Sequence, residues 1–347
     1  MKRIILTLSA VFSLAVGIFA QEAESAPSQT EGNGEFGEIE AAQAGEPQET
    51  NAPQAAQAYT PPATTFLPML TLLGVYMPNN GIIDVKIPYV MPMLQARFSH
   101  RFTDFGAKPE VTFIADGEIA PVWMRAGAHF DFKPLSFLTF SAGGDMATSW
   151  GMNLGFLDFD FIGKYDRTKG EYDAFTPFTH WVYDGWVQVA LKYDIGGAIS
   201  GGKQHVVFDA SYRAQYTGMT GVANGEVWMH QGESERANGL SYVATAALNY
   251  QIPHKYFKSV GASAKASGYY SERFFDEEYR ICDPTFVDLT FTLTATASIG
   301  YKDHFMLMIP FSGKRDFDCD DSLRPLSAPD GRKWTADGVI LTFTHIF

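Results

Sequence analysis

The sequence predicts an all-β fold in which one antiparallel up-and-down β-barrel crosses a membrane with its strands. Apolar and polar residues alternate along many segments, and the long ones, 240–252 and 287–300, are near or above the roughly 9–11 residues with which a tilted strand spans a bilayer. Short and long connections separate these segments. Aromatic residues make up 14% of the chain although only 19% of its residues are charged. This composition fits a barrel wall, because polar residues on the inner face dilute the apolar residues on the outer face.

Residues 1–20 have the features of a secretory signal peptide. Lys2 and Arg3 precede an apolar stretch, and Ala20 offers a small residue for cleavage. Residues 21–65 are rich in Ala, Gln, Glu and Pro and contain no Lys or Arg. A segment with so few large apolar residues cannot offset the entropic cost of ordering, so we expect a disordered acidic linker. The net charge of −13 comes without a basic patch, which argues against nucleic acid as a partner.

Residues 66–91 are ambiguous. Asn80-Gly81 lies between apolar runs and indicates a hairpin. Several prolines in the same stretch weaken the prediction of strands. The stretch is therefore either a hairpin within the wall or a segment that leads into a barrel formed by residues 92–347. The barrel has about twelve strands in the first case and about ten in the second.

Wall strands are predicted from residue 93 onward. They cover residues 93–101, 122–132, 135–142, 183–193, 205–215, 241–251, 260–267, 287–300, 305–311 and 339–347. Between them we expect short turns at one end of the barrel and long connections at the other, the long ones being 103–121, 143–181, 217–239, 271–284 and 313–337. A soluble β-sandwich also alternates, but its strands average about 5–6 residues, so the longer segments favour the barrel.

The last predicted strand places Leu341, Phe343 and Phe347 on one face and ends the chain with an aromatic residue. It resembles the closing strand of bacterial outer-membrane β-barrels, although His345 departs from the pattern. The resemblance covers about residues 92–347 and points to the general porin-like class rather than to a named subfamily. It implies a bacterial outer-membrane location, a periplasmic linker, and membrane lipids and the barrel-assembly machinery as partners. It also implies that Phe343 and Phe347 form the assembly signal.

The patterns of barrel enzymes are missing from the sequence. Outer-membrane proteases of the ten-stranded class use an Asp-x-His arrangement and outer-membrane phospholipases a His-x-Ser pattern, and neither occurs. We therefore expect no enzyme and no cofactor. Asp316, Asp318 and Asp320 space their carboxylates as a calcium loop does, but the Gly and Glu that such a loop requires are absent. The better interpretation of these three residues is a solvated acidic loop, with no metal.

Charged residues on the polar face of the predicted strands are the candidate lumen lining. Arg or Lys facing lipid at the bilayer midplane costs about 2–4 kcal/mol, so we expect these residues to point inward. The set is Arg97, Arg101, Arg125, His129, Asp131, Asp184, Lys192, Asp209, Arg213, Lys265 and Asp288. They form either a paired network that fills a narrow barrel, or a polar pore with a basic stripe of Arg97, Arg101 and Arg125 on neighbouring strands.

The pore hypothesis predicts a passive channel for small polar solutes. The alternative is a non-conducting barrel that displays its long loops for adhesion or anchors the acidic linker. Transport of hydrophobic molecules ranks third, because the clearest predicted strands turn Thr and Ser inward. The oligomeric state does not follow from the sequence.

Cys282 and Cys319 are the only cysteines, and an exported chain enters an oxidising compartment. One cysteine precedes and the other follows the hairpin that turns near Lys302, so both should lie at similar heights beyond the same rim. We predict a disulfide between them, which would stabilise the fold by about 3–4 kcal/mol in the chain-entropy model. The alternative is two free loop thiols.

Overall fold

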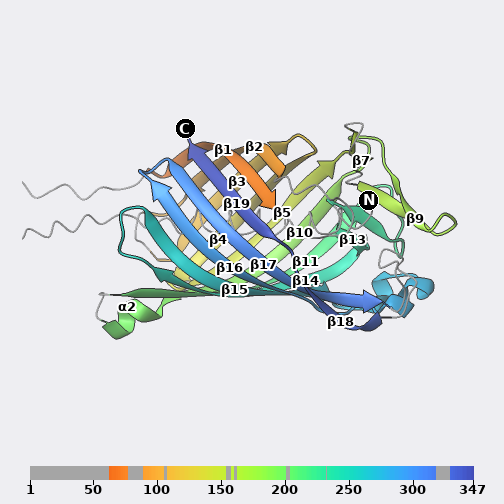
Figure 1. Cartoon of the computed structure of the whole chain (residues 1–347). Helices are drawn as coiled ribbons and strands as arrows, with labels where there is room; N and C mark the ends of the chain where they lie inside the picture. Colours follow the sequence, from red (N-terminus) through yellow and green to blue (C-terminus); the bar gives the residue numbers. More distant parts are fainter. Residues whose placement is uncertain are drawn as a thin grey trace, which may run out of the picture.

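The computed structural model describes residues 62–76, 89–104, 108–153, 158–159, 162–200, 204–231, 233–317 and 329–347. Within these ranges twelve strands form the wall of a closed antiparallel barrel. The wall strands are β1 (Thr64–Tyr76), β2 (Tyr89–Arg101), β3 (Glu110–Ala120), β4 (Trp123–Leu135), β5 (Leu138–Ser149), β10 (Val182–Asp194), β11 (His205–Met219), β14 (Gly239–Gln251), β15 (Phe257–Tyr269), β16 (Asp288–Ile299), β17 (Asp303–Phe317) and β19 (Val339–Ile346). Each pairs with the next, and β19 closes the ring onto β1 (Figure 1).

The strand count matches the larger of the two predicted numbers. However, the two strands beyond ten do not both come from the ambiguous stretch, as the hairpin prediction requires. Only β1 comes from the ambiguous stretch, so the wall begins at Thr64 and includes part of the segment that was left open. The twelfth strand is β3, which lies inside residues 103–121. The prediction of a long loop there was wrong: β3 returns through the wall, and only the short connection 121–122 follows it.

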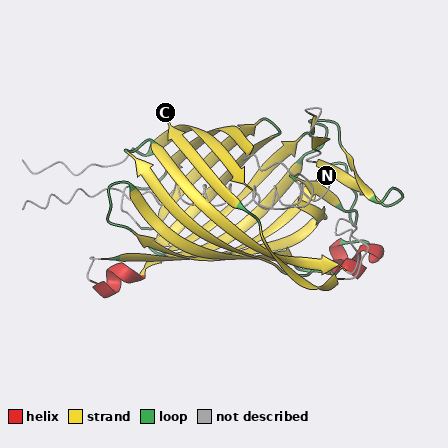
Figure 2. Ribbon diagram, in the orientation of Figure 1, coloured by secondary structure: helices red, strands yellow, loops and turns green. Residues whose placement is uncertain are grey.

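The two ends of the barrel differ. The turn end, where β19 finishes, carries short connections and the helix α2 (Ile195–Ser200). The loop end, where β5, β11 and β15 finish, carries the connections 150–181, 220–238 and 270–287. Figure 2 shows α2 at one end of the strands and the two short helices of the loop end at the other. Beyond the rim, β18 (Pro329–Ala336) extends the sheet by pairing with the last residues of β17.

The loop-end connections fold onto one another and form what we call the loop cap. Its four-stranded sheet consists of β8 (Ile162–Asp166), β9 (Glu171–Ala174), β12 (Trp228–His230) and β13 (Glu233–Arg236). A two-residue pairing of β6 (Met152–Asn153) with β7 (Asp158–Phe159) and the 3-10 helices η1 (Glu272–Phe274) and η2 (Glu277–Cys282) complete it. Two buried clusters hold the cap together, one around Trp228 and one around Tyr165, Phe275 and Tyr279.

The outer face of the wall is apolar and exposed. Phe130 on β4 is 52% exposed and Leu293 on β16 is 51% exposed, whereas the neighbouring Thr292 is only 2% exposed. Because the ring is closed, the backbone polar groups of the wall pair within it, which is what a sheet needs in order to cross lipid. In the described part of the chain, no helix is both long and apolar enough to cross a membrane. The predicted signal peptide and nearly all of the predicted linker lie outside the described residues.

Candidate functional site

A cluster of charged and aromatic side chains lies on the inner face of the wall strands β3 to β11. Arg125 donates from Nη2 to Asp145 Oδ1 at 2.6 Å, and its Nη1 lies 3.9 Å from Asp116 Oδ2. The Trp186 indole donates from Nε1 to the other Asp145 oxygen at 2.8 Å. Arg213 lies over the Trp186 ring at 4.1 Å. We call Asp116, Arg125, Asp145, Trp186 and Arg213 the central cluster.

The wall geometry brings the central cluster together. Gly127 on β4 is the cross-strand partner of Asp145 on β5, and a Cβ at Gly127 would collide with the Asp145 carboxylate. The glycine therefore leaves room for that carboxylate to reach Arg125 two residues away. Because side chains on one face repeat every second residue, Arg125 and Gly127 share the inner face of β4.

A chain of hydrogen bonds extends from β19 to β4 on the same inner face. The Thr344 and Thr71 hydroxyls lie 3.1 Å apart, and Thr71 donates to Gln95 Oε1 at 2.9 Å. Gln95 then donates from Nε2 to Glu118 Oε2 at 2.8 Å. The Trp123 indole donates to the other Glu118 oxygen. These contacts satisfy the buried Glu118 carboxylate, since hydrogen bonds can compensate for the loss of water, and Arg125 is its cross-strand partner on β4.

The predicted basic stripe does not form. Arg97 lies on β2 and Arg125 on β4, and the acidic residues of β3 stand between them. Arg97 has Asp116 as its cross-strand partner, and Arg101 lies at the turn end, where its Nε donates to the Thr103 carbonyl at 3.1 Å. The stripe was predicted on neighbouring strands because β3 had been assigned to a loop. The inner face of the wall instead carries basic side chains on β2 and β4 and acidic side chains on β3, between them.

The other predicted lining residues are spread around the ring. His129 Nε2 lies 3.8 Å from Asp131 Oδ1, and Ser141 donates to the same Asp131 oxygen at 2.6 Å. Asp184 accepts a hydrogen bond from the Thr217 hydroxyl. Lys192 on β10 and Asp209 on β11 are cross-strand partners. Lys265 lies on β15 and Asp288 on β16.

Asp116, Glu118, Asp145 and Trp186 are functional candidates that the sequence prediction did not select. Trp186 lies in the predicted strand 183–193, two residues from the selected Asp184 and so on the same face, and the alternation therefore carries a usable signal. Asp145 was missed because β5 was expected to end at residue 142, whereas it continues to Ser149. Asp116 and Glu118 were missed together with β3.

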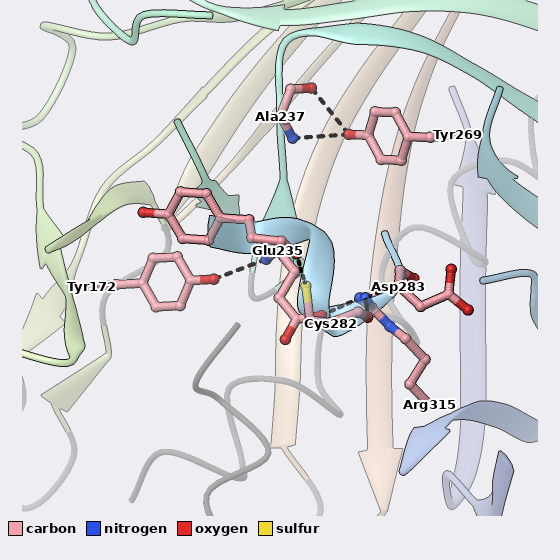
Figure 3. Close-up of polar contacts among 8 residues, drawn as sticks. Tyr172, Glu235, Ala237, Tyr269, Cys282, Asp283 and Arg315 are labelled. Carbon is pink, nitrogen blue, oxygen red and sulfur yellow. Dashed lines mark hydrogen bonds and ion pairs between the residues drawn. The ribbon is translucent and has the colours of Figure 1, made fainter. Parts of the chain in front are cut away.

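A second polar site lies in the loop cap and connects it to the wall (Figure 3). Arg315, near the end of β17, forms a buried ion pair with Glu235 of β13, and the side chains are 13% and 9% exposed. The same guanidinium donates to the carbonyl oxygens of Cys282 and Asp283, the latter at 3.1 Å. Glu235 adopts a φ of 59°, a left-handed conformation that is unusual for a residue other than Gly, Asn or Asp. We call these contacts the cap latch.

The cap latch is held in place by two tyrosines. Tyr172 accepts a hydrogen bond from the Glu235 backbone N–H at 2.8 Å, and the Tyr269 hydroxyl bridges the N–H and the carbonyl of Ala237, both at 3.0 Å. Glu235 Oε1 is buried without a hydrogen-bond partner in the described part of the chain. Burial raises the pKa of the Glu235 carboxyl, and Arg315 opposes this rise only in part. The latch therefore contains a buried carboxylate, whose desolvation costs free energy, where the loop cap meets the wall.

Cys282 is a buried thiol, 1% exposed, and its Sγ donates to the Tyr279 carbonyl at 2.7 Å. Burial raises the pKa of this thiol to about 11. Cys319 lies outside the described residues, so the disulfide stays a prediction. Asp318 and Asp320 also lie outside them, and within the described ranges no group of three metal-binding side chains occurs.

The predicted assembly signal lies at the turn end. Phe347 is 62% exposed, its N–H donates to the Pro68 carbonyl at 3.1 Å, and Phe343 packs against Phe305 with ring centroids 5.0 Å apart. His345, the departure from the pattern, lies 2.8 Å from the Asp303 carboxylate through Nδ1. The role of the two phenylalanines in assembly stays a prediction.

The closed wall, its apolar outer face and its polar inner face define a transmembrane β-barrel of the bacterial outer-membrane type. No protein family model matches the sequence, and no curated protein matches it either.

The barrel resembles solved structures at low sequence identity. It is similar to the KdgM porin in complex with disordered oligogalacturonate, at 8% identity and a TM-score of 0.36, over 80% of this chain and 99% of that one. It is similar to OmpT, an outer membrane protein of Vibrio cholerae, at 8% identity and a TM-score of 0.37, over 82% and 99% of the chains. It is also similar to the translocator domain of the autotransporter NalP from Neisseria meningitidis, at 9% identity and a TM-score of 0.35, over 84% and 90%.

Proposed function

We propose that the protein is a passive outer-membrane channel for small polar solutes. The central cluster is the observation that carries this proposal. It places two arginines and two aspartates on the inner face of adjacent strands, where a purely structural barrel could have used apolar side chains. Fixed charges of both signs along a wall give a hydrated ion or a polar solute groups to bind in place of water. In this proposal the predicted charged residues line the lumen together with Asp116, Glu118 and Asp145.

The channel should discriminate only weakly between anions and cations. Arg125 is paired with Asp145 and lies near Asp116, so its charge is largely compensated within the wall. Selectivity depends on the net charge that a permeating ion meets, and here neighbouring residues cancel. This replaces the anion preference that an uninterrupted basic stripe would have produced.

Single-channel recording of the full-length refolded protein in a planar bilayer tests the proposal. We expect discrete conductance steps and a small reversal potential in a salt gradient. Arg125→Gln should shift that potential toward cation preference, because it leaves Asp145 and Asp116 uncompensated. Lys255→Gln, on the exposed turn between β14 and β15, is the matched control and should leave the potential unchanged. A protein that inserts but does not conduct would contradict the proposal.

A further inference from the structure

The two arginines of the central cluster differ in the hydrogen-bond donors that they leave unused. Arg125 directs its guanidinium to the Asp145 carboxylate. Arg213 instead donates from Nε to Gln188 Oε1 at 2.8 Å, and its guanidinium lies over the Trp186 ring at 4.1 Å. Among the described residues, neither Nη group of Arg213 has a hydrogen-bond or ion-pair partner. Arg213 is therefore the arginine of the cluster whose charge is not bonded to a carboxylate.

The free Nη groups of Arg213 are accessible to solvent. In the described part of the chain, Glu235 Oε1 is the one buried side-chain nitrogen or oxygen that has no hydrogen-bond partner. An unbonded Nη group of Arg213 must therefore have accessible surface. Val243, the cross-strand partner of Arg213 on β14, is half-buried and apolar, so it offers no acceptor on that side.

The contacts that Arg213 does make fix the direction of its guanidinium. Stacking on the Trp186 indole holds the plane of the group, and the bond from Nε to Gln188 holds its rotation within that plane. The two Nη groups then present parallel N–H donors at one edge of the plane. This edge matches the two oxygens of a carboxylate, which arginine binds through two parallel hydrogen bonds. Little rotamer freedom remains to be lost when such a group binds.

The charges around Arg213 favour an anion with a single charge. Asp145 and Asp184 are cross-strand partners on β5 and β10, and both lie close enough to interact electrostatically with Arg213. Asp145 directs its oxygens to Arg125 and to the Trp186 indole rather than to Arg213. A dianion such as phosphate would meet twice the repulsion from these carboxylates that a monoanion meets.

We propose that Arg213 is a binding subsite for small organic monocarboxylates that pass through the channel. This deepens the proposed function and rests on it. The solute carboxylate accepts hydrogen bonds from both Nη groups, and its short alkyl part lies beside Val243. With two arginines and two aspartates the central cluster has no net charge, so the geometry of the donors recognises the solute. Weak discrimination between simple anions and cations is therefore compatible with selective binding of a carboxylate.

Reduction of the single-channel current by added solutes tests the proposal on the full-length refolded protein. The probes are butyrate, the uncharged butyramide of similar shape, and inorganic phosphate, each added to potassium chloride near neutral pH. We expect butyrate to halve the current at a concentration about tenfold lower than butyramide, because hydrogen bonds to charged groups are the stronger ones. Phosphate should block more weakly than butyrate.

Arg213→Lys keeps the charge and removes the pair of parallel donors, so the half-blocking concentration of butyrate should rise about tenfold. Gln188→Met, on the neighbouring strand, should raise it several-fold by releasing Nε, and it keeps the test decisive should the first variant fail to assemble. Lys255→Gln, on the exposed turn, is the control and should leave the block unchanged. Equal block by butyrate and butyramide, or full block by butyrate in Arg213→Lys, would overturn the inference while conductance persists. Absence of any conductance would instead refute the proposed function.

Discussion

Whether the cap latch holds the loop cap against the wall can be tested by changing one residue. The change is Glu235→Gln, which keeps the shape of the side chain and removes its charge. Arg315 then remains buried, at 13% exposure, without its anionic partner. Removing one member of a buried pair costs about 3–5 kcal/mol. Arg315 keeps its hydrogen bonds to two carbonyl oxygens, so the lower end, about 3 kcal/mol, is the appropriate figure.

A loss of about 3 kcal/mol in the closing of the cap raises the population of its open form roughly 100-fold. The assay is limited trypsin digestion of the refolded protein, following cleavage after Arg273 and Arg280 in the two 3-10 helices. When opening and closing are fast relative to cleavage, the cleavage rate reports the population of the open form. The variant should therefore be cut about 100-fold faster there, while the wall keeps its heat-modifiable migration on gels.

Asp173→Asn is the matched control for this experiment. It breaks the exposed pair of Asp173 with Lys169, whose side chains are 47% and 52% exposed, without removing a trypsin site. Exposed pairs contribute about 0.2–1 kcal/mol, so cleavage should rise less than about fivefold. If Glu235→Gln changes cleavage no more than Asp173→Asn does, the latch does not hold the cap, and the reasoning from burial is wrong.

Three further predictions concern topology, assembly and the cysteines. The connections 150–181 and 220–238, which lie within the long loops predicted at 143–181 and 217–239, should be cut by protease on intact cells, because long connections belong outside; cleavage confined to lysed cells would reverse the orientation. Removal of Phe347 should lower membrane insertion, and unchanged yield and heat-modifiable migration would contradict its role. If Cys282 is a free thiol, its raised pKa should slow alkylation about 100-fold at pH 8 relative to an ordinary thiol, with the rate rising until about pH 11. If the predicted disulfide exists, neither Cys282 nor Cys319 is labelled after unfolding without reductant; labelling of both would refute it.

The sequence was sufficient to predict the fold class because most wall strands separate lipid from a polar interior. On β16, Thr and Asp alternate with Leu, Phe and Ala, and the structure follows that pattern residue by residue. The pattern fails on β1, whose inward Leu73 and outward Leu72 are both apolar. In the sequence, a strand with two apolar faces is a continuous run of apolar residues. Such a run does not show whether the segment is a wall strand or leads into the barrel.

β3 was missed for a different reason. Val111, Phe113 and Ile119 alternate with Thr112 and Glu118, so its signal was present in the sequence. The prediction treats residues 103–121, between two clear strands, as a single connection and therefore misses β3. That error also removed β3 from the candidate site and produced the basic stripe.

The periodicity of the sequence does not predict the strands and contacts of the loop cap. Its latch joins Arg315 to Glu235, which are separated by 80 residues, and its strands are two to five residues long. Segments this short contain too few residues for an alternation of apolar and polar residues to indicate their structure. Their arrangement follows from tertiary packing around Trp228 and Phe275, which only the folded molecule shows.

The seam of the barrel joins its first strand to its last. Thr71 and Thr344, whose hydroxyls lie 3.1 Å apart, are separated by 273 positions along the chain. Every other neighbouring pair of wall strands can zip together as a hairpin or across one connection, whereas this pair meets only when both ends of the sheet have been brought together. Contacts between such distant residues carry a large closure entropy and form slowly. Until then the growing sheet has two open edges, each able to pair with a foreign strand, so export of this chain requires protection of β1 and β19 until the ring is complete.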